Sequence, residues 1–384
     1  MKKLFTLLVL VSILACSEKA PEQIYQGKLE EFISGSFIIE KDSTTSRLDF
    51  QKIIDHDGKR FFVSREDQGY SLFNTETGKK EFTFKIPKEG PLSLKGHAVA
   101  YQVFDGNEFI AVSSQGNVKK YISGVEVKEM SLDWTDYQEK MLIQMSDTND
   151  NFIKIDSNRY QLFNNPFDIF NDEKSVDLDY REWVVEFDLE EGWVCASDLK
   201  APLGEEFSNS TSASHLKSVY NGNLNQFYLM FAPSDTLYQI QNCKVLRKIA
   251  LESVTEFKYL PGLYEQNGRN KNWKNNPTSA GNTSLNYDSN NELYIRMVLM
   301  KTEETQPEIK DIRERTGLNK STFILLVYDL GWRLKAELEL FYDAGQSSGN
   351  IIASKEGIFI TKTEQKSEDE YEFYKIDLSR FGDN

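Results

Sequence analysis

The amino-acid sequence predicts an all-β fold made of about six similar units, and three observations support this. Short alternating or continuous apolar runs recur along the chain, separated by turn residues. Helical periodicity is scarce. Hydrophobic residues make up 39% of the 384 residues, which is enough to bury a large core. The sequence therefore indicates a globular, strand-rich protein.

The first two units show the pattern most clearly. In the first unit, residues 61–63, 70–73 and 82–86 are three successive strands. In the second unit, Asp105 and Gly106 separate two apolar runs (98–104 and 109–112), and a third run follows (118–122). Asp-Gly between apolar runs is a strong hairpin signal. Each unit is most of a four-stranded antiparallel sheet.

The pattern returns four more times with looser spacing. The expected strands are 152–155, 160–163, 183–187 and 193–195; then 216–220, 226–231, 236–240 and 245–251; then 285–287, 293–299, 323–328 and 334–340; and finally 351–353, 358–360 and 371–376. The last unit lacks one strand, which residues 36–39 would supply. We therefore expect a six-bladed β-propeller with four-stranded antiparallel blades, its ring closed by an N-terminal strand, because closure removes an exposed sheet edge.

Long connections distinguish these units from the familiar propeller repeats of roughly 40 to 50 residues. The longest predicted loops are 202–214, 261–283 and 301–320, and only the last contains a candidate short helix, around 309–315. Because the repeats are weak, two packed β-sandwich domains remain the alternative fold.

The first sixteen residues have the layout of an export signal. Lys2 and Lys3 precede the apolar run 4–15, and the small residue Ala15 stands before Cys16. This run is too short to cross a bilayer, which needs about 20 residues. We expect a signal peptide over 1–15, a lipidated tether over 16–23 and a single propeller domain over 24–384. An ordinary signal peptide with a chance cysteine is the alternative.

The residues around the cysteine resemble a known processing site. The stretch 13–16, Ile-Leu-Ala-Cys, resembles the lipobox of bacterial lipoproteins, in which the cysteine thiol is acylated, with palmitate among the expected chains. Ser17, and not Asp, follows the cysteine, and this resembles the pattern of lipoproteins that are transported to the outer membrane. The resemblance implies a cell-envelope protein held on the membrane by lipid on Cys16.

Charge and hydropathy limit the possible partners. The formal net charge is -15, and loss of Lys2 and Lys3 with the signal takes it to about -17. This charge repels phosphate backbones, so nucleic acid is not an expected partner. No second apolar run reaches membrane-spanning length, which makes the lipid the only evident membrane attachment.

Several short stretches in order along the chain resemble a family of bacterial lipoproteins that carries a domain of unknown function and is similar to TolB-like six-bladed propellers. They are Glu89-Gly90-Pro91, Ser234-Asp235-Thr236-Leu237-Tyr238, Tyr287-Asp288 with Leu293-Tyr294-Ile295-Arg296, Val327-Tyr328-Asp329 and Lys355-Glu356-Gly357-Ile358. The resemblance implies the fold and the location, and it implies no activity.

Two cysteines remain after Cys16. An oxidising envelope compartment permits a disulfide between Cys195 and Cys243. Both lie in or beside apolar segments, which favours buried free thiols instead.

Signatures of catalysis and metal binding are scarce in this sequence. The three histidines, His56, His97 and His215, form no pair at metal-ligand spacing, and no phosphate-binding glycine loop is present. His56 is best interpreted as part of a hairpin turn. Residues 147–151 have oxygen ligands at calcium-like spacing, but a polar turn is the preferred interpretation. We expect no catalytic residue, no metal and no cofactor.

One loop has the composition of a binding site. Residues 267–277 combine Trp273 with side-chain amides and three cations, including Arg269 and Lys274, in an acidic protein. Such a loop can stack on a sugar ring or meet an acidic partner; alternatively, Trp273 only pins the loop to the body. The favoured function is a non-catalytic binding or scaffold module for a protein or glycan. The alternative is an envelope carbohydrate-active enzyme with carboxylates at the channel mouth.

Overall fold

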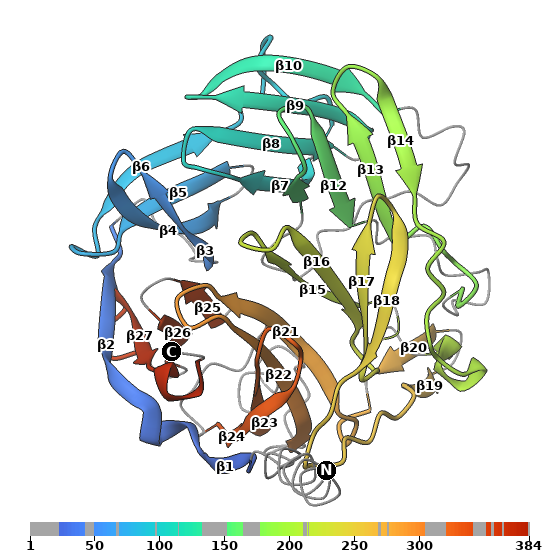
Figure 1. Cartoon of the computed structure of the whole chain (residues 1–384). Helices are drawn as coiled ribbons and strands as arrows, with labels where there is room; N and C mark the ends of the chain where they lie inside the picture. The colour runs from blue at the N-terminus through green and yellow to red at the C-terminus, as the bar shows by residue number, and fades with distance from the viewer. Residues whose placement is uncertain are drawn as a thin grey trace, which may run out of the picture.

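The computed structural model of the chain describes residues 23–42, 50–66, 69–96, 98–113, 115–132, 152–163, 177–209, 213, 215–267, 270–274, 276–303, 320–340, 351–354, 357–362 and 365–382. These residues form six blades, each built on four antiparallel strands and arranged in a ring around one axis, and one separate two-stranded sheet (Figure 1). Within five of the sheets, spatial order follows chain order, as expected when each blade is a meander of hairpins.

The first three blades lie between residues 50 and 196. Blade 1 comprises β3 (Phe50–His56), β4 (Lys59–Glu66), β5 (Gly69–Asn74) and β6 (Lys80–Lys85). Blade 2 comprises β7 (Ala98–Val103), β8 (Glu108–Ser113), β9 (Asn117–Ile122) and β10 (Val125–Ser131). Blade 3 comprises β11 (Phe152–Lys154), β12 (Arg159–Phe163), β13 (Val184–Asp188) and β14 (Gly192–Ala196). The sequence indicates three strands in each of the first two units, and β3 and β10 are the fourth strands that complete them.

The remaining blades have longer connections. Blade 4 comprises β15 (Leu216–Asn221), β16 (Gln226–Phe231), β17 (Thr236–Gln241) and β18 (Lys244–Ala250). Blade 5 comprises β21 (Gly281–Asp288), β22 (Leu293–Glu303), β23 (Lys320–Tyr328) and β24 (Leu334–Glu339). Blade 6 comprises β25 (Ile351–Ser354), β26 (Gly357–Thr361), β27 (Glu370–Ile376) and β2 (Ile33–Glu40). A 3₁₀ turn, η4 (Glu205–Asn209), lies in the predicted loop 202–214, and a second, η7 (Ser379–Phe381), follows blade 6. The candidate helix around 309–315 lies outside the described residues.

Several hairpins are closed by an Asp or Asn side chain at the start of the turn. Asp105 Oδ1 accepts the backbone N–H of Asn107 at 2.9 Å and that of Glu108 at 2.8 Å. The same pair of bonds is made by Asn74, Asp156, Asp188 and Asp288. Such a side chain replaces a backbone acceptor, which is why these residue types mark turns between apolar runs.

The N-terminal segment closes the ring and also clamps it from outside. β2 pairs antiparallel with β27 and is the outermost strand of blade 6, so the predicted closure by an N-terminal strand is confirmed. Just before it, β1 (Tyr25–Lys28) pairs parallel with β24 and adds a fifth strand to blade 5. The short 3₁₀ turn η1 (Leu29–Phe32) joins the two. One continuous segment thus binds the outer edges of two neighbouring blades.

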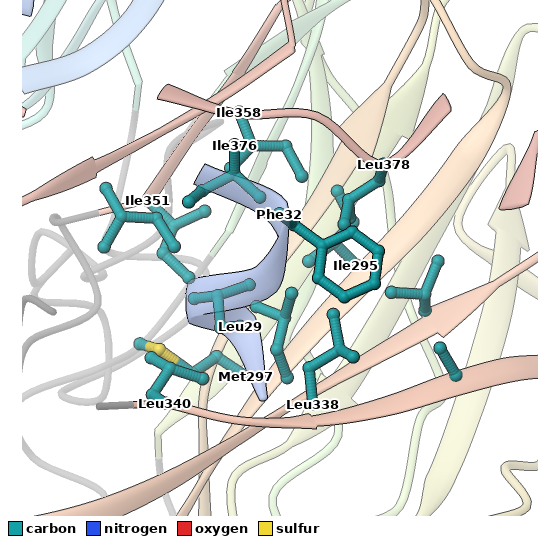
Figure 2. Packing of buried hydrophobic residues seen from close by; sticks show 14 of the residues in the cluster. Leu29, Phe32, Ile295, Met297, Leu338, Leu340, Ile351, Ile358, Ile376 and Leu378 are labelled. Atoms are coloured by element: carbon teal, nitrogen blue, oxygen red, sulfur yellow. The ribbon is translucent and has the colours of Figure 1, made fainter. Parts of the chain in front are cut away.

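The core is divided among the contacts between blades. Among the described residues, buried hydrophobic side chains form six clusters, and each cluster belongs to one pair of adjacent blades. The cluster between blades 5 and 6 also receives Leu29 and Phe32 of η1, which pack beside Ile295, Leu338 and Ile376 (Figure 2). A closed ring with one core layer per interface excludes the two-sandwich alternative and confirms the propeller.

Candidate partner-binding site

The connection between blades 4 and 5 contains a hairpin of its own. Residues Leu263–Asn267 (β19) pair antiparallel with Asn270–Lys274 (β20). These two strands form a separate two-stranded sheet, and in the described structure they join none of the blades. In Figure 1 the hairpin lies at the rim of the ring, outside the blades. The expectation of a plain loop over 261–283 is therefore wrong.

This hairpin carries part of the predicted binding loop. The register places Trp273 opposite Tyr264 and Lys274 opposite Leu263. Arg269 lies outside the described residues. The dipeptide Asn267-Gly268 is the sequence signal that could have indicated this hairpin.

The root of the hairpin is fixed by hydrogen bonds between its two legs. The Ala280 N–H donates to the Lys258 carbonyl at 2.8 Å, and the Leu260 N–H donates to Ser279 Oγ at 2.8 Å. Both bonds tie the chain entering the hairpin to the chain leaving it. The ribbon therefore projects from a defined base.

A fully buried arginine attaches this base to the blades. Arg296 on β22 is 0% exposed, and its Nε donates to Asn282 Oδ1 at 2.6 Å. Its Nη2 donates to Tyr259 Oη at 2.7 Å and to Asp235. The guanidinium lies 5.3 Å from the centre of the Phe257 ring. One side chain of blade 5 thus contacts blade 4 and the root of the hairpin.

The charge of this arginine is stabilised by its neighbours. Burial alone lowers the pKa of Arg296, but Tyr259, Tyr328 and Asp235 outweigh it, and the pKa lies above its ordinary value. Burial raises the pKa of Tyr259, so its hydroxyl keeps its proton and donates to Asp235 Oδ1 at 2.6 Å. A buried charge needs such partners to be tolerated.

A groove of about 770 Å³ adjoins the root of the hairpin. Its walls are β1, the outer half of blade 5 and the residues on either side of the hairpin. Lys28, Lys258 and Lys301 line it, together with the carboxylates of Glu256 and Glu339. The groove therefore combines apolar surface with charged side chains of both signs.

One wall of this groove is held by a buried carboxylate. Glu337 is 5% exposed, and its Oε2 accepts the N–H of Thr255 at 3.1 Å and the hydroxyl of the same residue at 2.9 Å. The Val254 N–H also donates to this carboxylate. Glu337 therefore holds the start of the connection between blades 4 and 5 against β24, where it forms part of the groove wall.

Buried carboxylates elsewhere in the described residues have structural partners. Glu108 accepts Lys154 Nζ at 2.6 Å and Tyr160 Oη at 2.8 Å. Burial raises the pKa of Glu108, but these bonds and the charge of Lys120 outweigh it, so the pKa is lowered. A general acid of a glycoside hydrolase needs the opposite shift. Burial does raise the pKa of Asp288, yet that side chain closes the β21–β22 turn.

The two remaining cysteines are bonded to each other. Cys195 on β14 forms a disulfide with Cys243 in the β17–β18 turn, with 6.1 Å between their Cα atoms. The expectation of buried free thiols is therefore wrong. The residues are 48 positions apart, and only the packing of blade 3 against blade 4 brings them together.

The other sequence expectations have mixed outcomes. His56 ends β3 beside a turn in which Asp57 and Gly58 both have positive φ, which confirms the hairpin turn. His97, the segment 147–151 and Cys16 lie outside the described residues. The absence of catalytic, metal and cofactor sites stays a prediction. The described part of the chain contains no helix that is both long enough and apolar enough to span a bilayer.

Six four-stranded blades around one axis define the class of this protein as a six-bladed β-propeller. The same fold is found in the crystal structure of a member of the DUF4221 family from Bacteroides vulgatus, with a TM-score of 0.71 and 14% sequence identity. The match covers 90% of this chain and 97% of that chain. At this identity the likeness establishes the fold alone.

Weaker similarities add no functional argument. A luciferin-regenerating enzyme matches with a TM-score of 0.43 and 8% identity, over 90% of this chain and 96% of that chain. The hydrazine synthase of Kuenenia stuttgartiensis matches with a TM-score of 0.39 and 10% identity, over 84% and 79% respectively. No protein-family model matches the sequence, and no curated protein matches it.

Proposed function

We propose that this protein is a lipid-anchored binding module of the cell envelope, and that its partner docks on the β19–β20 hairpin and the adjoining groove. The observation that carries the proposal is the hairpin itself. It joins none of the described blade strands, yet its root is fixed by the buried Arg296 network. A rigidly mounted ribbon that the ring does not require is well suited to recognition.

A protein partner fits these features best. A two-stranded ribbon has unpaired backbone groups along its outer edges, which a strand of another protein can extend. The backbone register places Tyr264 directly opposite Trp273 in the hairpin. Aromatic residues are enriched among the residues that dominate binding energy. The mixed charges of the groove favour a polar rim contact.

The proposed location rests on the N-terminus and on the disulfide. The lipobox-like stretch ending at Cys16 supports lipidation, and Ser17 supports the outer membrane. The Cys195–Cys243 disulfide supports an envelope location, because disulfides form and persist in oxidising compartments. No observation on the described residues favours a carbohydrate-active enzyme.

Affinity capture from solubilised membranes tests the docking surface. The baits are the wild type, Trp273→Ala and, as a control, Leu246→Ala, which removes an exposed hydrophobic side chain on β18. We expect the wild type and the control to capture the same protein, and Trp273→Ala to capture at least about tenfold less. Equal capture by all three baits contradicts the proposal. Retention on glycans alone, in a parallel screen, contradicts the choice of a protein partner.

A further inference from the structure

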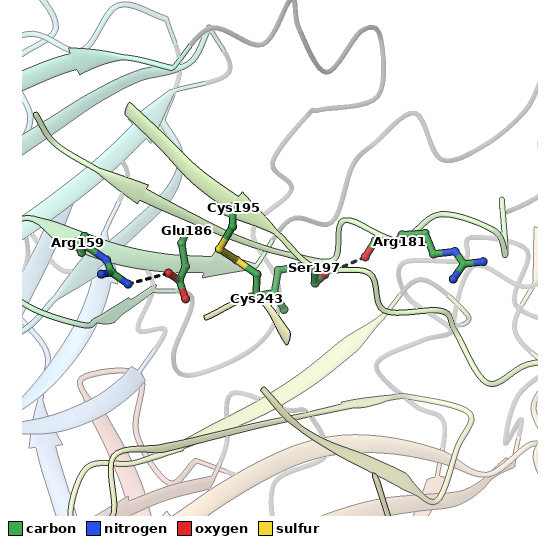
Figure 3. The surroundings of a disulfide bond; sticks show 7 residues. Arg159, Arg181, Glu186, Cys195, Ser197 and Cys243 are labelled. Carbon is green, nitrogen blue, oxygen red and sulfur yellow. Dashed lines mark hydrogen bonds and ion pairs between the residues drawn. A yellow bond between two sulfur atoms is a disulfide. The ribbon is translucent and has the colours of Figure 1, made fainter. Parts of the chain in front are cut away.

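The disulfide lies beside a buried acid from the neighbouring strand. Glu186 on β13 is directly opposite Cys195 on β14 in the register, and Cys243 comes from blade 4 (Figure 3). A carboxylate oxygen of Glu186 and the two sulfur atoms all lie within 4.8 Å of one another. Three potential metal ligands from three chain segments thus meet at the junction of blades 3 and 4.

The carboxylate of Glu186 is incompletely satisfied in the disulfide form. Its side chain is 1% exposed, and Oε2 accepts Arg159 Nη2 at 3.1 Å. The buried Oε1 has no hydrogen-bond partner. An acceptor left unpaired in the interior costs about 1–3 kcal/mol, so such a group in a folded protein calls for an explanation. A bonded pair of sulfur atoms offers no donor to satisfy it.

We propose that reduction of the Cys195–Cys243 bond turns this junction into a zinc site whose ligands are the two thiolates and Glu186. Thiolate and carboxylate are ligands that Zn²⁺ accepts in tetrahedral sites, and water takes the fourth position. With Zn–S near 2.3 Å and Zn–O near 2.1 Å, ligand atoms lie roughly 3.5–3.8 Å apart. The three atoms therefore need to move by only about an ångström.

The charges of this site balance. Two thiolates and one carboxylate carry three negative charges, Zn²⁺ carries two positive charges, and the paired Arg159 guanidinium supplies the third. Neutrality matters because Glu186 and Cys243 are almost fully buried. Arg159 holds one oxygen of Glu186 and leaves the other for the metal.

The conversion requires a dithiol reductant. A thiolate of the reductant attacks Cys195, which is the more exposed of the two sulfurs, and the S–S bond breaks. The second thiol of the reductant closes its own disulfide, so two electrons and two protons pass to Cys195 and Cys243. Zn²⁺ then displaces both thiol protons to solvent. The metal replaces the covalent link between β14 and blade 4.

Cobalt titration tests this site, because Co²⁺ occupies zinc sites and its thiolate complexes absorb strongly in the near ultraviolet. The mature protein is reduced with dithiothreitol, freed of reductant under argon and titrated with Co²⁺. We expect one Co²⁺ per reduced chain with thiolate charge-transfer absorption, release of Co²⁺ on addition of Zn²⁺, and no such absorption from the oxidised protein.

Variants identify the ligands. Glu186→Gln should weaken Co²⁺ binding by at least about tenfold while the thiolate absorption remains. Glu191→Gln, an exposed acid in the β13–β14 turn, should bind as the wild type does. The double variant Cys195→Ser/Cys243→Ser should retain the propeller, judged by circular dichroism, and show no thiolate absorption.

Three results would overturn the proposal. They are the absence of stoichiometric Co²⁺ binding by the reduced protein, equal binding by Glu186→Gln and the wild type, and loss of the fold on reduction, because the site requires blades 3 and 4 to stay in place.

Discussion

Arg296 is the side chain on which the attachment of the hairpin depends most. Its replacement by alanine leaves Asn282, Tyr259 and Asp235 without their shared donor. We expect Arg296→Ala to lower the free energy of unfolding by about 2–4 kcal/mol, because it leaves the buried Asn282 oxygen without its donor and empties a packed site. Urea denaturation measures this cost.

The matched control for this change is an exposed pair. Arg181 forms an ion pair with Asp198 at 3.2 Å, and both side chains are well exposed. Arg181→Ala should therefore change the free energy of unfolding by no more than about 1 kcal/mol. Equal costs for the two variants would mean that the Arg296 network does not hold the blades and the hairpin root together.

Cys16 is the residue on which the proposed membrane attachment depends. Replacement by alanine removes the thiol that would be acylated, and with it the cleavage step that follows. We expect Cys16→Ala to accumulate as unprocessed precursor, with no incorporation of radiolabelled palmitate. Cys243→Ala provides the control, because it removes a different cysteine. Normal lipid labelling of Cys16→Ala would exclude this anchor.

Among the elements, the N-terminal clamp formed by β1, η1 and β2 contributes most to closing the ring. Leu29 of η1 is 0% exposed within the core between blades 5 and 6. We expect Leu29→Ala to lower the free energy of unfolding by about 2–5 kcal/mol, since it empties a packed site.

Ile38 provides the comparison for Leu29 within the same segment. It lies on β2 and is 41% exposed, so Ile38→Ala should cost less than about 1 kcal/mol. Thermal unfolding of both variants beside the wild type measures the difference. If Leu29→Ala were as stable as Ile38→Ala, η1 would not be part of the core.

The elements also show how far the sequence predicts this fold. Strands such as β16 can be predicted from an apolar run bounded by turn residues. Closure of the ring by β2 can be predicted because the last unit of the sequence lacks one of its four strands. β1 has no such signal, because four residues paired parallel to a distant strand depend on the finished ring. The β19–β20 hairpin has a local signal in Asn267-Gly268, a dipeptide typical of hairpin turns.

The site was harder to predict than the strands. The composition of residues 267–277 predicts a binding loop around Trp273, which stays a prediction, whereas the groove at the root of the hairpin combines β1, blade 5 and a connection that are far apart in the chain. Arg296 stands between apolar residues of β22, a pattern that indicates a paired buried charge without naming the partners. The disulfide likewise joins residues that only the packing of two blades brings together.

At the scale of the whole molecule, buried tyrosines set the response to alkali. Burial raises the pKa of Tyr328 to about 12, and it also raises the pKa values of Tyr70, Tyr121, Tyr160 and Tyr294. In the unfolded chain a tyrosine ionises near pH 10. The folded state therefore holds these protons more tightly, and its stability is full below about pH 10 and declines as the pH rises toward 12.

Alkaline denaturation measures this decline. We expect the urea concentration at the midpoint of unfolding to decrease as the pH rises from about 10 toward 12, and tyrosinate absorbance to appear in one steep step together with unfolding. Gradual ionisation of all tyrosines near pH 10, with the fold intact, would contradict the burial of these hydroxyls between blades.

At the same scale, we propose a closed propeller whose hairpin binds a partner in the cell envelope. Site-specific photo-crosslinking in living cells tests it most directly, with a photoreactive residue placed at Trp273 and, for comparison, at Leu246 on β18. The account predicts one discrete protein adduct from position 273 and none from position 246. No adduct at position 273, or the same adducts from both positions, would contradict it.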